Sequence, residues 1–198
     1  MEQVRDNSLE SRKAPPGWPV VRNPAIMMCL VAGLGLSAQR TSRAAAAPLE
    51  YQVKAAFLLN FTKFVEWPSS AFATPDSPLA ICILGGDPFG GALDQIVEGE
   101  VVNGRKLVIK RLTHAPPPKT CQVLFAAKSE KDIANILAAV GPGVLTVGEG
   151  ESFLRDGGII AFVIEDRRVR FDIKETTAAH AGLKLSSKLM NVARFVEK

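Results

Sequence analysis

Three short apolar runs, almost free of charge, recur along residues 48–198 of the chain. They read LAICILG, CQVLFAA and GIIAFVIE over residues 79–85, 121–127 and 158–165. Runs this short, and this rich in β-branched and aromatic residues, are typical of strands buried on both faces. Segments with helical patterns stand between them. The sequence therefore predicts a single α/β domain with a mixed parallel and antiparallel sheet flanked by helices.

Helical spacing marks the segment that precedes the first of these runs. In residues 48–67, apolar residues recur every three or four positions, and Pro68 provides a stop signal. We therefore predict an amphipathic helix with an apolar stripe that faces the core. This stripe comprises Val53, Ala56, Phe57, Phe61, Phe64 and Val65.

Local signals predict one tight turn and two helix starts. Asn103-Gly104 stands between β-branched runs, which is the sequence pattern of a β-hairpin. Asp87 as the N-cap and Pro88 as the first helical residue predict the start of a helix. Residues 129–132 resemble a capping box in front of a further helix.

The C-terminal segment combines a hairpin with a final helix. Val169, Phe171 and Ile173 alternate with charged residues, which predicts a half-solvated strand antiparallel to the apolar run before it. Apolar residues then recur at helical spacing up to the end of the chain, with Ser186 or Ser187 as the N-cap. The face that we expect this helix to bury comprises Leu189, Val192, Ala193 and Val196.

The charge balance directs attention to the first quarter of the chain. The net charge is +4, yet residues 48–198 hold 18 basic and 17 acidic groups. A nearly neutral domain without a long Lys/Arg run argues against nucleic acid as a partner. The positive excess lies in the first 47 residues, where a targeting signal explains it better than a nucleic-acid partner does.

Residues 1–46 read as a leader, a cleaved signal peptide. The uncharged run AIMMCLVAGLGLSA is about 14 residues long, shorter than the roughly 20 that a transmembrane helix needs. Small-residue triplets at 36–38 and 44–46 are both cleavage candidates, of which we favour the second. An uncleaved leader that anchors the protein in the inner membrane, or a disordered tail, is the alternative. We expect residues 47–198 to form the exported domain.

Cys82 and Cys121 each lie in a predicted buried strand of this domain. In an exported domain two such cysteines predict one disulfide, the alternative being two buried free thiols. They form no C-x-x-C motif, and His114 and His180 are isolated, so no zinc or redox site is predicted. The sequence also lacks a P-loop, an H-E-x-x-H motif and an S-x-x-K motif. We therefore predict neither a cofactor nor a catalytic site.

One loop is a candidate ligand site. Gly85, Gly86, Asp87 and Phe89 follow a predicted strand and precede a predicted helix, which is where α/β sheets bind ligands. The loop has neither the G-x-G-x-x-G pattern nor a Walker lysine. An ordinary turn is therefore the competing interpretation, and we favour it.

Two charged groupings also have both a functional and a structural interpretation. Arg167, Arg168 and Arg170 form a basic patch beside two acids, and this patch is either an anion site or a solvated hairpin tip. Glu149 and Glu151 are either paired carboxylates or part of a glycine-rich turn. We favour the structural interpretation of both.

Six segments of the chain, taken together, carry a family resemblance. They are YQVKAAFLLNFTKFVEWP, LAICILGGDPFG, VNGRKLVIKRL, CQVLFAAKSE, VLTVGEGESFLRDGGIIAFVIEDRRVRFDI and AGLKLSSKLMNVA, in this order within residues 51–194. The combination resembles the YfiR-like family of exported bacterial proteins. The resemblance implies a small periplasmic α/β domain without catalytic activity. The best understood role in the family is to bind the periplasmic sensor region of a membrane diguanylate cyclase and lower its cyclic-di-GMP output.

The resemblance also maps the family's cysteine pair onto Cys82 and Cys121, and it implies that redox state and disulfides tune folding and release. Some relatives carry a second cysteine pair near residues 147–158, which this chain lacks. Lys174 stands where the family often has Asn, so the surface that follows it is expected to differ.

We therefore expect a periplasmic regulatory protein that represses a membrane diguanylate cyclase and so opposes biofilm formation. The partner is the periplasmic part of that cyclase or of a similar receptor, and exposed sheet edges also allow a homodimer. A periplasmic small-molecule binding module that uses the Gly85–Gly91 loop is the alternative. The expected partner surface comprises Arg170, Phe171, Asp172, Lys174, Leu183, Ser186 and Lys188.

Overall fold

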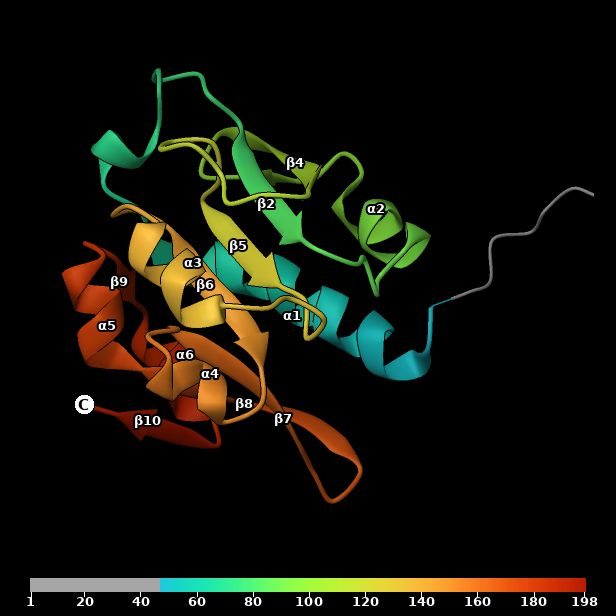
Figure 1. Ribbon diagram of the computed structural model, residues 1–198. Coiled ribbons are helices and arrows are strands. Elements are labelled where there is room, and N and C mark those ends of the chain that lie inside the picture. The colour runs from blue at the N-terminus through green and yellow to red at the C-terminus, as the bar shows by residue number, and fades with distance from the viewer. Residues whose placement is uncertain (1–46) are drawn as a thin grey trace, which may run out of the picture. The chain divides into compact units, whose positions relative to one another are not determined.

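The computed structural model describes residues 47–198, and the predicted leader at residues 1–46 lies outside the described residues (Figure 1). The helices are α1 (Leu49–Phe64), η1 (Ser69–Ala71), α2 (Gly91–Val97), α3 (Ile133–Ala139), α4 (Ser152–Arg155), α5 (Glu175–His180) and α6 (Ser187–Val192). The strands are β1 (Val65–Glu66), β2 (Leu79–Leu84), β3 (Val101–Val102), β4 (Arg105–Leu112), β5 (Val123–Ala126), β6 (Leu145–Glu149), β7 (Ile160–Glu165), β8 (Arg168–Lys174), β9 (Lys184–Leu185) and β10 (Phe195–Glu197).

One mixed sheet organises the domain, with the strand order β10-β8-β7-β6-β5-β2-β4-β3. Strands β4, β2, β5, β6 and β7 are parallel to one another. β8 runs antiparallel to β7, β10 lies parallel to β8, and β3 runs antiparallel to β4. β1 and β9 form a separate antiparallel ribbon. The predicted mixed α/β architecture is confirmed.

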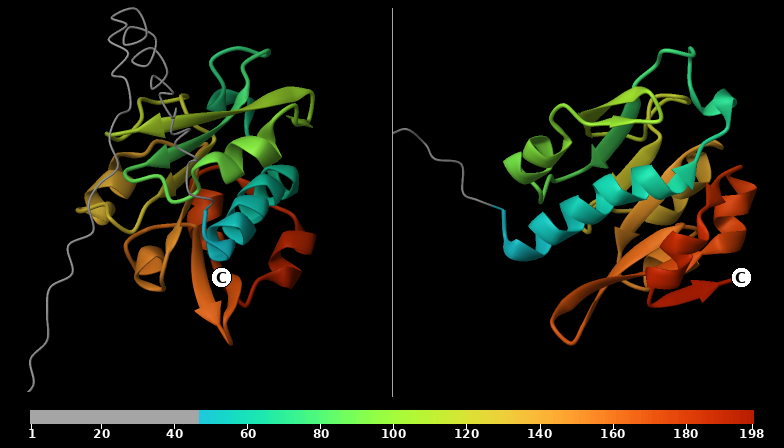
Figure 2. Two further views of the ribbon diagram at one scale, coloured as in Figure 1. Left: turned by 90° about the vertical axis from the view of Figure 1, so that its right-hand side faces the viewer. Right: turned by 180° about the vertical axis from the view of Figure 1, so that it is seen from behind.

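Helices cover both faces of the sheet (Figure 2). Along β2, Ile81 and Ile83 point into a large core that α1 and α2 cover, because alternate side chains of a strand point to opposite faces. Cys82 and Leu84 point to the other face, where α3 lies. α4 covers the same face as α3 and places Phe153 against Ala161 of β7.

The predicted disulfide is present. Cys82 in β2 and Cys121, just before β5, are joined with their Cα atoms 5.8 Å apart. Both cysteines are buried in the core between the sheet and α3. The bond therefore links two neighbouring strands inside the protein rather than at its surface.

The helix α1 buries a different stripe from the one predicted. The prediction is correct at Phe61, and also at Val65, which is buried but begins β1. It is wrong at Val53, Ala56 and Phe64, which are exposed. The buried face instead includes Lys54, which is only 3 % exposed, together with Ala55 and Leu58. Lys54 can lie there because two carboxylates bind its ammonium group.

Two of the local start signals have other roles. α2 begins at Gly91 rather than at Pro88, because the Asp87 carboxylate accepts hydrogen bonds from the N–H groups of Phe89 and Gly90 and closes a turn before the helix. The capping box is also wrong: Asp132 precedes α3 in the left-handed conformation, with no hydrogen bond from its side chain to the helix.

Two other signals are correct. The Asn103-Gly104 turn joins β3 to β4, with positive φ at both positions, as a type I′ turn requires. The Ser186 side chain accepts a hydrogen bond from the Leu189 N–H and caps α6. In both cases the determining contacts lie within a few residues of the chain.

The predicted C-terminal helix ends early. α6 stops at Val192, which is 60 % exposed, and Phe195–Glu197 form β10. The outer side of β8 offers unpaired main-chain groups, and the last residues of the chain pair with them at Asp172–Lys174. Pairing with a strand therefore overrides the helical spacing that includes Val196.

Candidate functional site

A buried charged cluster lies at the carboxyl ends of the parallel strands, where α/β sheets commonly bind ligands. Lys54 of α1 donates hydrogen bonds to Glu50, one helical turn away, and to Glu149 at the end of β6. The Tyr51 hydroxyl donates to the same Glu149 carboxylate at 3.2 Å. The Lys54 ammonium also lies 4.5 Å from the centre of the Tyr51 ring. These contacts fix the start of α1 against β6.

The electrostatics of this cluster keep Lys54 charged. Burial alone would lower the pKa of Lys54, but hydrogen bonds to Glu149 and Glu50 outweigh it and raise that pKa above 10.5. Burial, together with the negative charge of Glu149, raises the pKa of Tyr51 above 10.0. The Glu149 carboxylate therefore serves as the counter-ion of Lys54.

A second charged cluster centres on Arg194, between α6 and β10. Its guanidinium binds both oxygens of the buried Asp172 carboxylate, with Nε 2.8 Å from Oδ1, and also binds Glu151 at 2.8 Å. Hydrogen bonds to Asp172 and Glu151 raise the pKa of Arg194, and the same guanidinium lowers the pKa of Glu151. Glu149 and Glu151 thus bind separate cations and are not a carboxylate pair.

A cavity of about 390 Å³ lies between the two clusters. Lys54, Glu149 and Arg194 line it together with Lys128 and the side chains of β7. Because both signs of charge line this cavity, and most of them bind one another, its walls are held in place by ion pairs.

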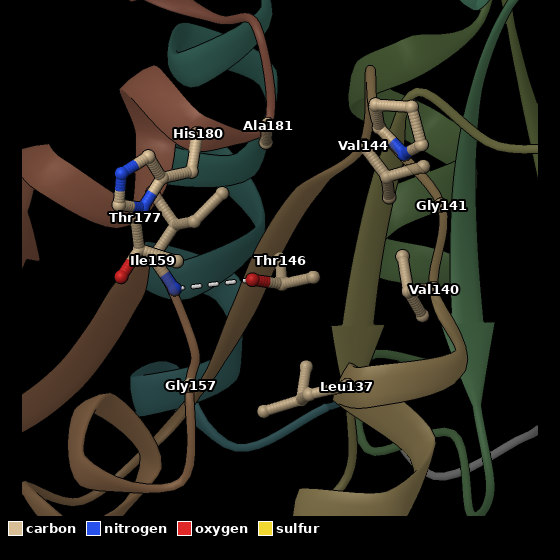
Figure 3. A pocket seen from close by; sticks show the side chains of 11 residues that line it. Leu137, Val140, Gly141, Val144, Thr146, Gly157, Ile159, Thr177, His180 and Ala181 are labelled. Atoms are coloured by element: carbon tan, nitrogen blue, oxygen red, sulfur yellow. Dashed lines mark hydrogen bonds between the residues drawn. The ribbon is translucent and has the colours of Figure 1, made fainter.

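A second cavity, of about 410 Å³, opens at the amino ends of the strands (Figure 3). Leu137, Val144 and Ile159 give it apolar walls, and His180 lies at its exposed rim. The Thr146 hydroxyl faces this cavity but already accepts a hydrogen bond from the Ile159 N–H at 3.0 Å. This hollow could accept an apolar group, but it lies at the opposite end of the sheet from the charged clusters.

The candidate ligand loop is packed as a turn. Phe89 is fully buried between Tyr51 and Phe125, with ring centroids 5.7 and 4.8 Å away. Asp87 binds its own loop through Oδ1 and accepts from Arg111 Nε through Oδ2 at 2.7 Å. The side chain of Glu130 covers Gly85, where an added Cβ would lie 2.1 Å from a carboxylate oxygen. The loop's polar groups are bound within the protein, which favours the interpretation as a turn.

The structure divides the expected partner surface. Phe171, Asp172 and Leu183 are buried, so their inclusion in a surface was wrong. They read as surface residues because their strand and turn alternate polar and apolar side chains, but Phe171 packs into the aromatic core and Asp172 binds Arg194. The residues that reach solvent are Arg170, Lys174, Ser186 and Lys188.

The sheet edge expected beside this surface is shorter than predicted. β10 covers β8 from Asp172 to Lys174, and Lys174 forms an ion pair with Glu197 at 2.9 Å. Only the part of β8 from Arg168 to Arg170 has no strand on its outer side within the described part of the chain.

Lys54, Glu149 and Arg194 were not predicted as a group. Glu50 and Lys54 stand four residues apart on a helix, a spacing that predicts an ion pair but normally an exposed one. Glu149 is the last residue of a buried strand, which was the available signal that its carboxylate lies near the core. No local pattern singles out Arg194, because its partners lie 22 and 43 residues earlier in the chain.

Comparison with known proteins places this fold in context. The family model described as YfiR/HmsC-like matches residues 51–194. A similar solved structure is that of a conserved domain protein from Vibrio cholerae O1 biovar eltor, with 11 % sequence identity and a TM-score of 0.48. The similarity covers 74 % of this chain and 60 % of that one, so this chain spans less than two thirds of its length. None of the curated proteins compared with the chain matches it.

Proposed function

The chain belongs to the YfiR/HmsC-like family, and from this membership we propose that it is a periplasmic repressor of a membrane-bound diguanylate cyclase. Proteins of the family are periplasmic regulators of diguanylate cyclase signalling. The proposed repressor binds the periplasmic sensor region of the cyclase, lowers cyclic-di-GMP and opposes biofilm formation. The match over residues 51–194 carries the proposal, because it runs from α1 to the residue before β10.

The family is regulatory rather than catalytic, and the arrangement of the charged groups supports such a role here. Lys54 and Arg194 bind carboxylates from distant parts of the chain and hold α1, β6, β8 and β10 together. A protein that acts through its surface benefits from such a fixed frame, because less conformational entropy is lost on binding. The contact surface that we propose lies on the exposed Arg170 and Lys188 and the half-buried Lys174 and Ser186.

Export to the periplasm is part of the proposal. The leader at residues 1–46, with its basic residues, apolar run and small-residue triplets, supports secretion followed by cleavage. Among the described residues, no helix combines the length and apolar character needed to cross a bilayer. N-terminal sequencing of the periplasmic protein checks this step, and we expect a start at Ala47.

The alternative function, a small-molecule module that uses the Gly85–Gly91 loop, gains no support from the geometry. Phe89 lies in the core, and the Asp87 carboxylate binds main-chain N–H groups and Arg111. We therefore do not propose it as the function.

Deletion of the gene tests the proposal. We expect cyclic-di-GMP and surface adhesion to rise, and to return to their original values when the full-length protein is supplied. A variant without residues 1–46 is the control, because it folds in the wrong compartment and should not restore them. Crosslinking in the periplasm should join the exported protein to a membrane diguanylate cyclase. Unchanged cyclic-di-GMP and adhesion, with no crosslinked cyclase, would contradict the proposal.

A further inference from the structure

The β7–β8 hairpin extends beyond the rest of the sheet (Figure 1). β6 pairs with β7 only as far as Phe162, and β10 pairs with β8 only from Asp172 onward. Between these residues the two strands pair with each other and, within residues 47–198, with no other strand. We name residues Val163–Arg170 the distal ribbon. Two-stranded ribbons are only marginally stable by themselves in water, so an additional strand would stabilise this one.

The outer side of β8 in the distal ribbon offers free main-chain groups. The Arg194 N–H donates to the Phe171 carbonyl at 2.9 Å, which shows that Phe171 directs its main-chain groups to this side. Because main-chain groups alternate in direction along a strand, Val169 directs its N–H and C=O to the same side. In the described part of the chain no strand lies opposite Val169 there.

The distal ribbon has one apolar and one charged face. Ile164 lies directly opposite Val169, so the two side chains share a face, and Ile164 is 53 % exposed. On the other face, Glu165 lies opposite Arg168. A hollow of about 220 Å³ on the charged face is lined by Glu165, Arg168 and Arg170, with Asp166 of the turn.

The distal ribbon carries a net positive charge, with Arg167, Arg168 and Arg170 against Glu165 and Asp166. Arg170 lies 3.8 Å from Glu165, whereas Arg167 and Arg168 form no ion pair with any described residue. A strand added beside β8 therefore gains from acidic side chains on the charged face and from apolar ones on the Ile164 face. A second copy of the same edge would bring its arginines against these arginines, which disfavours pairing between two copies.

We propose that the outer edge of β8 at Arg168–Arg170 binds an extended segment of a protein partner in which acidic and apolar residues alternate. Val169 supplies the main-chain hydrogen bonds of this added strand. Arg168 and Arg170 bind its carboxylates, and Val169, on the face that it shares with Ile164, contacts its apolar residues. The inference rests on the proposed function, because it assigns this segment to the periplasmic region of the repressed diguanylate cyclase.

Binding measurements with purified proteins test the inference. The periplasmic domain of each membrane diguanylate cyclase of the host organism is produced. Its affinity is measured for the protein that is expressed with its leader and purified from the periplasm. The double variant Arg168→Glu/Arg170→Glu should weaken binding at least about tenfold, since it opposes acidic groups with acidic groups. Val169→Ser and Val169→Pro should each weaken binding about tenfold, the former because it removes the apolar contact and the latter because it removes only the outward N–H.

A matched control separates a local effect from a change in net charge. Lys106→Glu/Lys131→Glu makes the same change in charge at exposed positions outside the distal ribbon. We expect this variant to bind as the wild type does. The exposed charge variants keep the test valid even if Val169→Pro fails to fold, and circular dichroism checks each variant.

The outcomes distinguish the two proposals. Weaker binding by the ribbon variants alone supports the inference. If the wild type binds a cyclase domain and the ribbon variants bind it equally well, or the control loses as much affinity as they do, the inference fails and the proposed function stands. If the wild type binds no cyclase domain, the proposed function fails and the inference fails with it.

Discussion

Lys54 and Glu149 stand 95 residues apart in the sequence, yet the ammonium of Lys54 donates a hydrogen bond directly to the Glu149 carboxylate. The two side chains are only 4 % and 9 % exposed. This contact joins the first helix to a central strand in a site from which water is largely excluded. We therefore expect the loss of this contact to destabilise the whole domain.

We expect Lys54→Met to lower the free energy of unfolding by about 3 kcal/mol, because it leaves the Glu149 carboxylate buried without its cation. Urea denaturation measures the change. Lys54→Met/Glu149→Leu should recover part of the loss, since neither charge then remains buried. Lys63→Met on the same helix is the control: its pair with Glu100 is exposed, and we expect a cost below about 1 kcal/mol. Equal losses for the two single variants would contradict the role of burial.

The same cluster predicts a dependence of stability on alkaline pH. The pKa of Lys54 is raised in the folded protein, so its contribution to stability is complete below the ordinary value of 10.5 and declines as the pH rises through the folded value. The raised pKa of Tyr51 acts in the same direction. Denaturation at increasing pH should therefore show that the wild type loses stability above pH 10.5. The loss should be smaller in Lys54→Met. A wild type and variant with parallel pH profiles would argue against the coupling.

Arg194 should control the attachment of the last strand. We expect Arg194→Met to cost about 3 kcal/mol, because Asp172 is then left buried without its counter-ion. Hydrogen exchange at the amides of β10 should accelerate more than exchange in β2. Arg194→Lys keeps the charge but loses the bidentate contact with Asp172. Its stability and its exchange rates in β10 should therefore lie between those of the wild type and Arg194→Met. Exchange in β10 that is unaffected by either change would show that strand pairing alone holds it.

The disulfide should contribute strongly to stability. It closes a loop with a sequence separation of 39, which corresponds to about 4 kcal/mol in the chain-entropy model and often to less in practice. Cys82→Ala/Cys121→Ala should therefore shift the denaturation midpoint to lower urea. Since both sulfur atoms are buried, a mild reductant should act on the bond only when denaturant is also present. Rapid reduction of the native protein would be inconsistent with that burial.

Local chemistry was the predictable part of this fold. The Asn103-Gly104 hairpin and the Ser186 cap depend on residues next to them, and both were predicted correctly. The buried strands were also predictable, because their apolar runs are short and rich in β-branched and aromatic residues. The strand order and the pairing of β10 with β8 could not be predicted from local sequence.

Long-range partners account for what the sequence did not predict. The local sequence predicts that Lys54 faces solvent. In the structure Glu149 binds it, so Lys54 is buried and the buried stripe of α1 differs from the predicted one. The local sequence predicts a helix at Phe195–Glu197, but in the structure these residues pair with the outer side of β8. The expected partner surface failed at Phe171 and Asp172 for the same reason, since packing against α1 and binding to Arg194 hide both side chains.

The bond between Cys82 and Cys121 also makes a covalent ring, and this ring contains α2, β3 and β4. The proline-rich segment at residues 113–119 lies within the ring and is largely exposed, as a protease would require. A single cut there opens the ring but releases no fragment, because both new ends stay tethered through sulfur. A protease can thus cut the outer edge of the sheet while the protein remains one molecule until it is both denatured and reduced.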